Sequence, residues 1–129
     1  LLIGTGGNVG AQSSTVVIRG LATGEIRPAR AAIILSREIG VGALMGIVLG
    51  SLVLVWAYLL GRDLRVAVIV GITLTSISTM AAMTGAALPF LFRLLRLDPA
   101  MVSAPFITTV MDIFGVVLYF FIARLLLQM

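Results

Sequence analysis

Long apolar stretches separated by short charged segments dominate the chain. No residue is charged within 39–61 or within 66–92, and the stretch 99–123 holds a single charge, Asp112. An α-helix rises about 1.5 Å per residue and the hydrocarbon core of a bilayer is about 30 Å thick, so each stretch is long enough to cross it. We predict transmembrane helices over residues 36–61, 66–93 and 99–124.

The opening segment, residues 1–20, is also helix-compatible but more polar. Asn8, Gln12 and Thr15 follow one another at spacings of four and three, and Arg19 continues the row, so a helix places all four on one face. Such a face cannot be surrounded by lipid, because polar groups in the hydrocarbon region need partners. We predict a fourth spanning helix over 1–20 whose polar face meets another helix or a water-filled path.

Composition places the chain among membrane proteins. Hydrophobic residues make up 60% and charged residues 11%, with a mean hydropathy of +1.21, against about 45–50% and about 25% in soluble domains. The net charge of +4 comes from arginines at or near the ends of apolar segments, which indicates membrane anchoring and not nucleic-acid binding. The chain has no Cys and no His, which excludes disulfides and thiolate or imidazole metal sites.

Basic residues are unevenly shared between the two predicted membrane faces. Four spans put the first and third connections on one side, and the second connection and the C-terminus on the other. The first side holds Arg19, Arg27, Arg30, Arg37, Arg93 and Arg96, and the second holds Arg62, Arg65 and Arg124. Because cytoplasmic loops carry the excess of basic residues, we predict that the C-terminus lies outside.

Small residues mark the predicted helix contacts. Gly42, Gly46 and Gly50 recur every four residues and therefore share one face of the 36–61 helix. Small residues at this spacing let two membrane helices approach closely, so the pattern predicts packing and no chemistry.

Asp112 is the residue that most clearly indicates a functional site. It lies about halfway along the 99–124 span, where a charge costs at least about 2.5–3.5 kcal/mol. The chain has no Lys, and its arginines lie in connections or at segment ends, so no intramembrane ion pair is visible. Two alternatives stay open: Asp112 binds a cation, or it is neutral and hydrogen-bonded, in a structural or proton-carrying role.

The surroundings of Asp112 favour a hard divalent cation. Thr108 and Thr109 precede Asp112 by four and three residues, and Gly115 follows it by three, which gives a small polar face on a helix. Oxygen donors suit Mg²⁺, Ca²⁺ or Mn²⁺ and not Zn²⁺ or Cu²⁺. A two-fold axis between two chains would pair the single carboxylate. Candidate pore-lining residues are Asn8, Gln12, Thr15, Thr108, Thr109 and Gly115.

Two segments resemble a known family. Residues 4–15, with the sequence GTGGNVGAQSST, resemble the second transmembrane helix of MgtE-type magnesium channels, which are related to eukaryotic magnesium carriers. Asp98–Pro99–Ala100 and residues 103–115, with the sequence SAPFITTVMDIFG, resemble the fifth helix of that family. The resemblance covers essentially the whole chain and is specific at its two ends.

The resemblance implies an all-α, polytopic helix bundle in the bacterial inner membrane, here the last four helices of a five-helix domain spanning residues 1–129. It implies a homodimer with the pore at the interface, lined by the second and fifth helices. Asp112 of both subunits would bind Mg²⁺ through water, and Mn²⁺, Co²⁺ or Ca²⁺ are further possible ions. The first helix, an N-terminal regulatory domain and a pair of CBS domains would precede this sequence.

Three other functions are alternatives to a Mg²⁺-selective channel. A proton- or Na⁺-coupled carrier of divalent cations could use Asp112 equally well. A structural membrane subunit would need no ion site. An intramembrane aspartyl protease needs two carboxylates sharing a proton, and no second acidic motif accompanies Asp112. We therefore expect no enzyme activity.

Overall fold

Four α-helices and two short 3₁₀ turns make up the computed structural model, which describes residues 2–61, 63–101 and 104–127. The elements are α1 (Leu2–Thr23), the turn Pro28–Arg30, α2 (Ala31–Leu59), α3 (Leu64–Leu94), the turn Pro99–Met101 and α4 (Ala104–Leu127). The expected all-α helix bundle is thus confirmed. Some positions used in the predictions lie outside the described residues. They are Leu1 of the 1–20 span, residues 102–103 of the 99–124 span, and Arg62 between two spans.

Two helices begin five residues away from their predicted starts. The α2 helix begins at Ala31, and the turn Pro28–Arg30 leads directly into it. The prediction placed the start at residue 36 because it used charged residues as the boundary, whereas a helix can continue past the membrane surface. In the last segment, Pro99–Met101 form a separate turn and α4 begins at Ala104.

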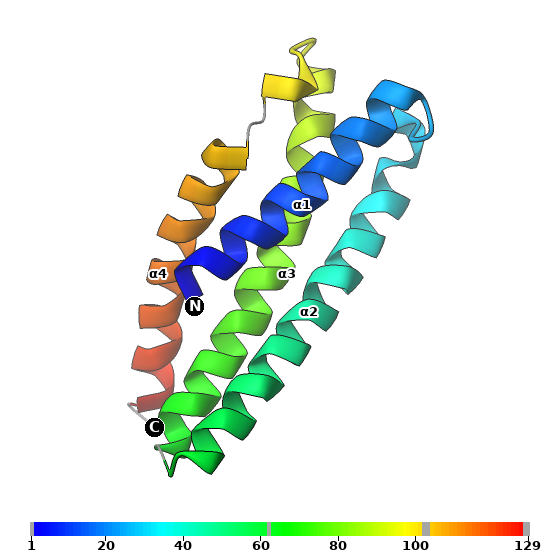
Figure 1. The fold of residues 1–129 in the computed structure, drawn as a ribbon. Coiled ribbons are helices and arrows are strands. Elements are labelled where there is room, and N and C mark those ends of the chain that lie inside the picture. Colours follow the sequence, from blue (N-terminus) through cyan, green and yellow to red (C-terminus); the bar gives the residue numbers. More distant parts are fainter. Residues whose placement is uncertain (1, 62, 102–103, 128–129) are drawn as a thin grey trace.

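The α3 helix occupies the centre of the bundle (Figure 1). It packs against α2 on one side and against α1 and α4 on the other, while α1 also lies along α4. The α2, α3 and α4 helices alternate in direction. Residues 24–30 and 95–101 therefore lie at one end, and residues 60–61, the start of α3 and the end of α4 lie at the other. This is the grouping of connections on which the predicted sidedness depends.

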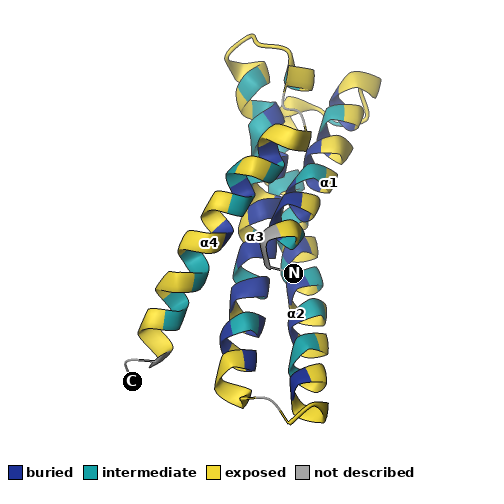
Figure 2. Ribbon diagram, turned by 60° about the vertical axis from the view of Figure 1, so that its left-hand side comes forward, coloured by how far each residue is buried: buried dark blue, intermediate teal, exposed yellow. Residues whose placement is uncertain are grey.

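Burial is concentrated on α3, and much apolar surface remains exposed (Figure 2). Half of the most apolar stretch of α3 is buried within the chain, against 17% of that of α2. Among the described residues, three helices are long and apolar enough to cross a membrane: Pro28–Leu59, Leu64–Leu94 and Ala104–Leu126. Large exposed side chains such as Leu44, Trp56 and Phe120 would be costly in water and are suited to lipid. The fold is that of an integral membrane protein.

Aspartates cap the two turns at the ends of α3. Asp63 is the N-cap residue of α3, and its Oδ1 atom accepts a hydrogen bond of 2.9 Å from the backbone N–H of Arg65. Asp98 Oδ1 accepts an equivalent bond of 2.9 Å from Ala100 at the start of the Pro99–Met101 turn. Asp63 and Asp98 thus each have a backbone partner, which the Oδ1 atom of Asp112 lacks among the described residues.

Candidate cation site and pathway

The polar row of α1 lies on the surface of the chain. Asn8, Gln12, Thr15 and Arg19 are all exposed, whereas Val9 and Val17, on the other side of the same helix, are buried. Val9 packs against α3 and α4, and Val17 packs against α3 and α2. The hydroxyl of Thr15 donates a 2.8 Å hydrogen bond to the carbonyl of Ala11. The sequence spacing therefore predicted one polar face correctly, and the fold turns that face away from its own core.

Asp112 lies at the boundary between the buried and the exposed side of α4. Asp112 as a whole is half-buried, but its Oδ1 atom is fully buried and has no hydrogen-bond partner among the described residues. Two serine hydroxyls, Ser14 Oγ and Ser78 Oγ, share that condition but carry no charge. A buried carboxylate oxygen without a donor is costly, so a cation, a water molecule or a proton has to satisfy it.

The helix itself cannot satisfy this carboxylate. A threonine hydroxyl can donate to the carbonyl four residues earlier, as Thr108 does to Ala104 at 2.8 Å and Thr109 to Pro105 at 2.9 Å. An ionised carboxylate only accepts hydrogen bonds, and N–H groups in the middle of a helix are already used by its own carbonyls. Asp112 therefore depends on a partner from outside α4.

Thr108 and Thr109 can each still accept a hydrogen bond from a water molecule. Each hydroxyl spends its hydrogen on its own helix, so its oxygen retains a lone pair that can accept from a water molecule. Thr109 is exposed and Thr108 is half-buried beside α1. Both are therefore able to bind the hydration shell of a cation without coordinating the metal directly.

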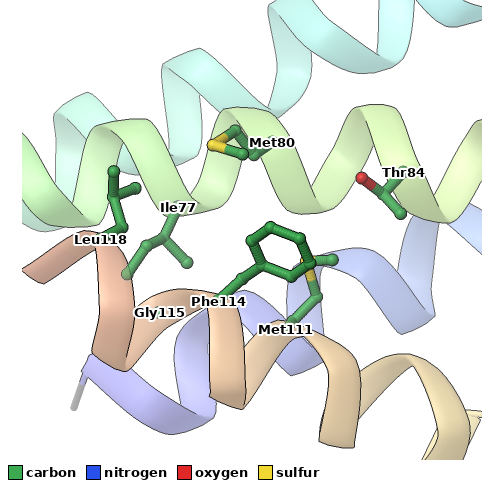
Figure 3. A pocket seen from close by; sticks show the side chains of 7 residues that line it. All are labelled: Ile77, Met80, Thr84, Met111, Phe114, Gly115 and Leu118. Carbon is green, nitrogen blue, oxygen red and sulfur yellow. The ribbon is translucent and has the colours of Figure 1, made fainter.

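Gly115 lies on the opposite side of Asp112 from Thr109. Residues of an α-helix follow one another by about 100°, which places Gly115 and Thr109 on opposite sides of Asp112, Gly115 on the buried side and Thr109 on the exposed side. Gly115 is buried and lines a small apolar hollow between α3 and α4 (Figure 3). The other lining residues are Ile77, Met80, Thr84, Met111, Phe114 and Leu118. The structure thus does not bring Gly115 to the surface that carries Asn8 and Thr109.

Glycines of α1 hold it against α3 and α4. A Cβ atom added to Gly7 would lie 2.7 Å from Thr108 Cγ2, and one added to Gly10 would lie 2.8 Å from Ile107 Cγ2. The Gly10 backbone also contacts Gly85 of α3. Asn8 follows Gly7 directly, so the N-terminal end of the polar row of α1 lies close to this contact with α4. Gly6 and Gly10 are four residues apart, a spacing of small residues that is itself a sequence signal for close packing.

One chain supplies a single carboxylate to the site. Over the ranges 2–61, 63–101 and 104–127, no three His, Cys, Asp or Glu side chains come together in a way that could hold a metal ion. The other acidic residues are Glu25 in the connection after α1, Glu38 in α2, and the aspartates that cap the turns at the ends of α3. An ion held by protein carboxylates alone would thus need a second chain, while an ion held through water needs fewer protein ligands.

The sequence matches one family model and several named proteins. Residues 1–122 match the sequence model of the family described as MgtE, divalent cation transporter. The chain is 43% identical over 128 residues to a protein of Thermus thermophilus named magnesium transporter MgtE. Proteins of the same name from Enterococcus faecalis and Bacillus subtilis are each 31% identical, over 128 and 123 residues. These matches cover 95–99% of this chain but only 27–28% of the relatives.

Proposed function

Because the chain belongs to the MgtE family of divalent cation transporters, we propose that it forms half of a Mg²⁺ channel whose pore lies between two copies of the chain. Asp112 of each copy binds the cation, and α1 and α4 line the path. The observation that carries the proposal is the buried, unpartnered Oδ1 of Asp112, halfway along a helix that is apolar enough to cross a membrane.

The chemistry of the candidate site favours hydrated Mg²⁺. The curated relatives are named magnesium transporters, and the site offers carboxylate, hydroxyl and amide oxygens, which are the donors that Mg²⁺ prefers. Mg²⁺ gives up its water reluctantly and is commonly held by one or two carboxylates. Asp112 therefore binds the ion through water, with the hydroxyls of Thr108 and Thr109 accepting from the same hydration shell. Mn²⁺, Co²⁺ and Ca²⁺ are the competing ions.

The exposed row on α1 supports the second copy. In a lone chain, Asn8 and Gln12 would project from the same surface region as the lipid-facing side chains, and amide groups in hydrocarbon are unfavourable. A homodimer with α1 and α4 at its interface covers that row and gives it a water-filled path. A two-fold axis also brings two Asp112 carboxylates to one cation, which a single chain cannot do.

Charge distribution supports the orientation. The end of the bundle that holds residues 24–30 and 95–101 also holds the larger share of the arginines, so it faces the cytoplasm and the C-terminus lies outside. The chain spans 28% of the length of its first two relatives. Regulation by an N-terminal domain and CBS domains, together with the remaining helix, belongs to the rest of such a protein.

Mg²⁺ flux into proteoliposomes tests the site. Asp112→Asn keeps the size of the side chain and removes its charge, so insertion and dimerisation should persist while flux falls. A hydrogen bond to a charged group contributes about 1.5–3 kcal/mol, which corresponds to a reduction of roughly ten- to a hundredfold. Asp98→Asn is the matched control, because Asn caps equally well and Asp98 lies outside the path. Unchanged flux in Asp112→Asn would refute the site.

A single-channel recording separates the channel from a coupled carrier. A pore should give discrete current steps with Mg²⁺ as the only permeant cation and without any proton or Na⁺ gradient. If flux required either gradient and no unitary current appeared, the carrier would replace the channel, with Asp112 still available as its ion site.

A further inference from the structure

We propose that Gly7 is a positioning residue, which determines where α4 places Asp112. This inference rests on the proposed function, since it takes Asp112 as the cation site. Its basis is the contact between α1 and α4, where the backbones of the two helices meet at Gly7 and Thr108.

The contact at Gly7 involves the backbone of α4. A Cβ atom added to Gly7 would lie 2.7 Å from Thr108 Cγ2, 3.0 Å from its Cα and 3.1 Å from its Cβ. Rotation of the Thr108 side chain can move only the first of these three atoms. The Cα atom belongs to the helix backbone, so a methyl group at residue 7 has to push α4 away from α1.

A displacement at Thr108 is transmitted to Asp112. The two residues are one helical turn apart on the same row of α4, and a hydrogen-bonded turn moves nearly as one body. In a two-fold dimer each chain makes the same displacement, so the separation of the two carboxylates can change by up to twice the displacement in one chain. Binding geometry has to be held within about 0.5 Å to be productive, which makes the site sensitive to this change.

Other glycines of α1 do not have this relation to Asp112. Nothing lies within 4 Å of a Cβ atom added to Gly4. At Gly6 the nearest atom belongs to the Ile77 side chain of α3, and at Gly10 it belongs to the Ile107 side chain. Both would also meet Met111, but only at the ordinary contact distances of 3.6 and 3.5 Å. Gly7 is the one glycine of the described α1 helix whose three nearest neighbours all belong to Thr108.

The test compares Gly7→Ala with Gly4→Ala in the full-length protein, reconstituted in liposomes. The two variants make the same substitution in the same helix, three residues apart. For Gly7→Ala we expect a several-fold change in the half-saturating Mg²⁺ concentration and an altered ratio of Mg²⁺ to Co²⁺ flux. Gly4→Ala should match the wild type. A purely structural loss would lower the maximal flux with the amount of folded protein and leave both the half-saturating concentration and the flux ratio unchanged.

A second variant addresses the cause. Thr108→Ser removes Cγ2, the atom nearest to the added methyl group, so Gly7→Ala/Thr108→Ser should recover part of the wild-type half-saturation and flux ratio.

If Gly7→Ala matches Gly4→Ala while Asp112→Asn still abolishes flux, the positioning role is refuted and the channel stands. If Asp112→Asn retains flux, the proposed function fails, and the positioning role fails with it. If both Gly7 variants are absent from the membrane while Gly4→Ala is present, Gly7 is a folding residue and the proposal is overturned.

Discussion

In the α2–α3 pair, glycines of α2 face the α3 backbone: a Cβ atom added to Gly46 would lie 2.5 Å from Thr75 Cα, and one added to Gly50 would lie 3.0 Å from the Gly71 carbonyl oxygen. In the α1–α4 pair, Gly7 meets the backbone of Thr108 at a similar distance. Both pairs therefore use small residues for close packing. The packing contacts alone do not indicate which pair carries the function.

The outward surfaces of the two pairs differ. The outer face of α2 presents Leu44, Leu52 and Trp56, which are suited to lipid. The outer face of α1 presents Asn8 and Gln12, next to the helix that contains Asp112. The proposed cation path therefore rests on polar groups without a partner among the described residues, and not on close helix packing alone.

Hydroxyl groups are present in both pairs and do not distinguish them. An open groove between α2 and α3 contains Ser51 and Thr75, whose hydroxyls donate to Val48 and Gly71 of their own helices at 2.8 and 3.0 Å. Thr108 and Thr109 make the same kind of bond in α4. Because such bonds satisfy the hydroxyl hydrogen within the helix, serine and threonine are compatible with lipid as well as with a pore.

An acid on the lipid-facing side of the α2–α3 pair should have the largest effect. Leu44 is 63% exposed and lies near the middle of α2, so Leu44→Asp places a carboxylate in hydrocarbon without a cation. We expect a cost of about 2.5–3.5 kcal/mol and a strong loss of membrane-inserted protein. Leu44→Asn is the neutral control and should be lost to a smaller extent. Insertion of Leu44→Asp at the wild-type level would show that this face does not contact lipid.

Overpacking of the α2–α3 contact should come next. Gly46→Ala places a methyl group against the α3 backbone, and we expect a loss of about 1–3 kcal/mol in stability, measured by thermal unfolding in detergent. Gly40→Ala, with nothing within 4 Å, should be neutral or slightly stabilising. Neither variant should change the half-saturating Mg²⁺ concentration. A change of that concentration in Gly46→Ala would mean that the α2–α3 pair also acts on the site.

Local sequence patterns predicted the helices and the isolation of Asp112, because hydrophobic length, helical spacing and charge are properties of neighbouring residues. They placed Gly115 together with Thr109 around Asp112, whereas the fold separates these two residues. The reason is that the row on which a residue lies follows from helical spacing, but the side that faces a neighbour depends on how the helices pack. The contact of Gly7 with Thr108 likewise joins residues a hundred positions apart, which no local pattern specifies.

Removal of an amide from the polar row of α1 should have an intermediate effect on transport. Asn8→Ala deletes a side chain that is exposed beside the Gly7–Thr108 contact, and we expect Mg²⁺ flux to fall by roughly two- to tenfold, as for the loss of one hydrogen bond of about 0.5–1.5 kcal/mol. Ser51→Ala, in the α2–α3 groove, is the control and should retain flux. Equal flux in the two variants would argue against α1 as a wall of the path.

The smallest effect should separate two threonines that have the same hydrogen bond. Thr75→Val and Thr109→Val each remove a hydroxyl that donates to its own helix, at 3.0 and 2.9 Å, so their stabilities should change by a similar small amount, about 0.5 kcal/mol or less. Thr109 also offers a free lone pair on the exposed side of Asp112, whereas Thr75 faces the α2–α3 groove. Flux should therefore fall by about two- to threefold in Thr109→Val alone, as for one lost hydrogen bond to water. Proteoliposome assays at a Mg²⁺ concentration below half-saturation measure this difference, and an equal loss in Thr75→Val would show that the two helix pairs contribute alike to the path.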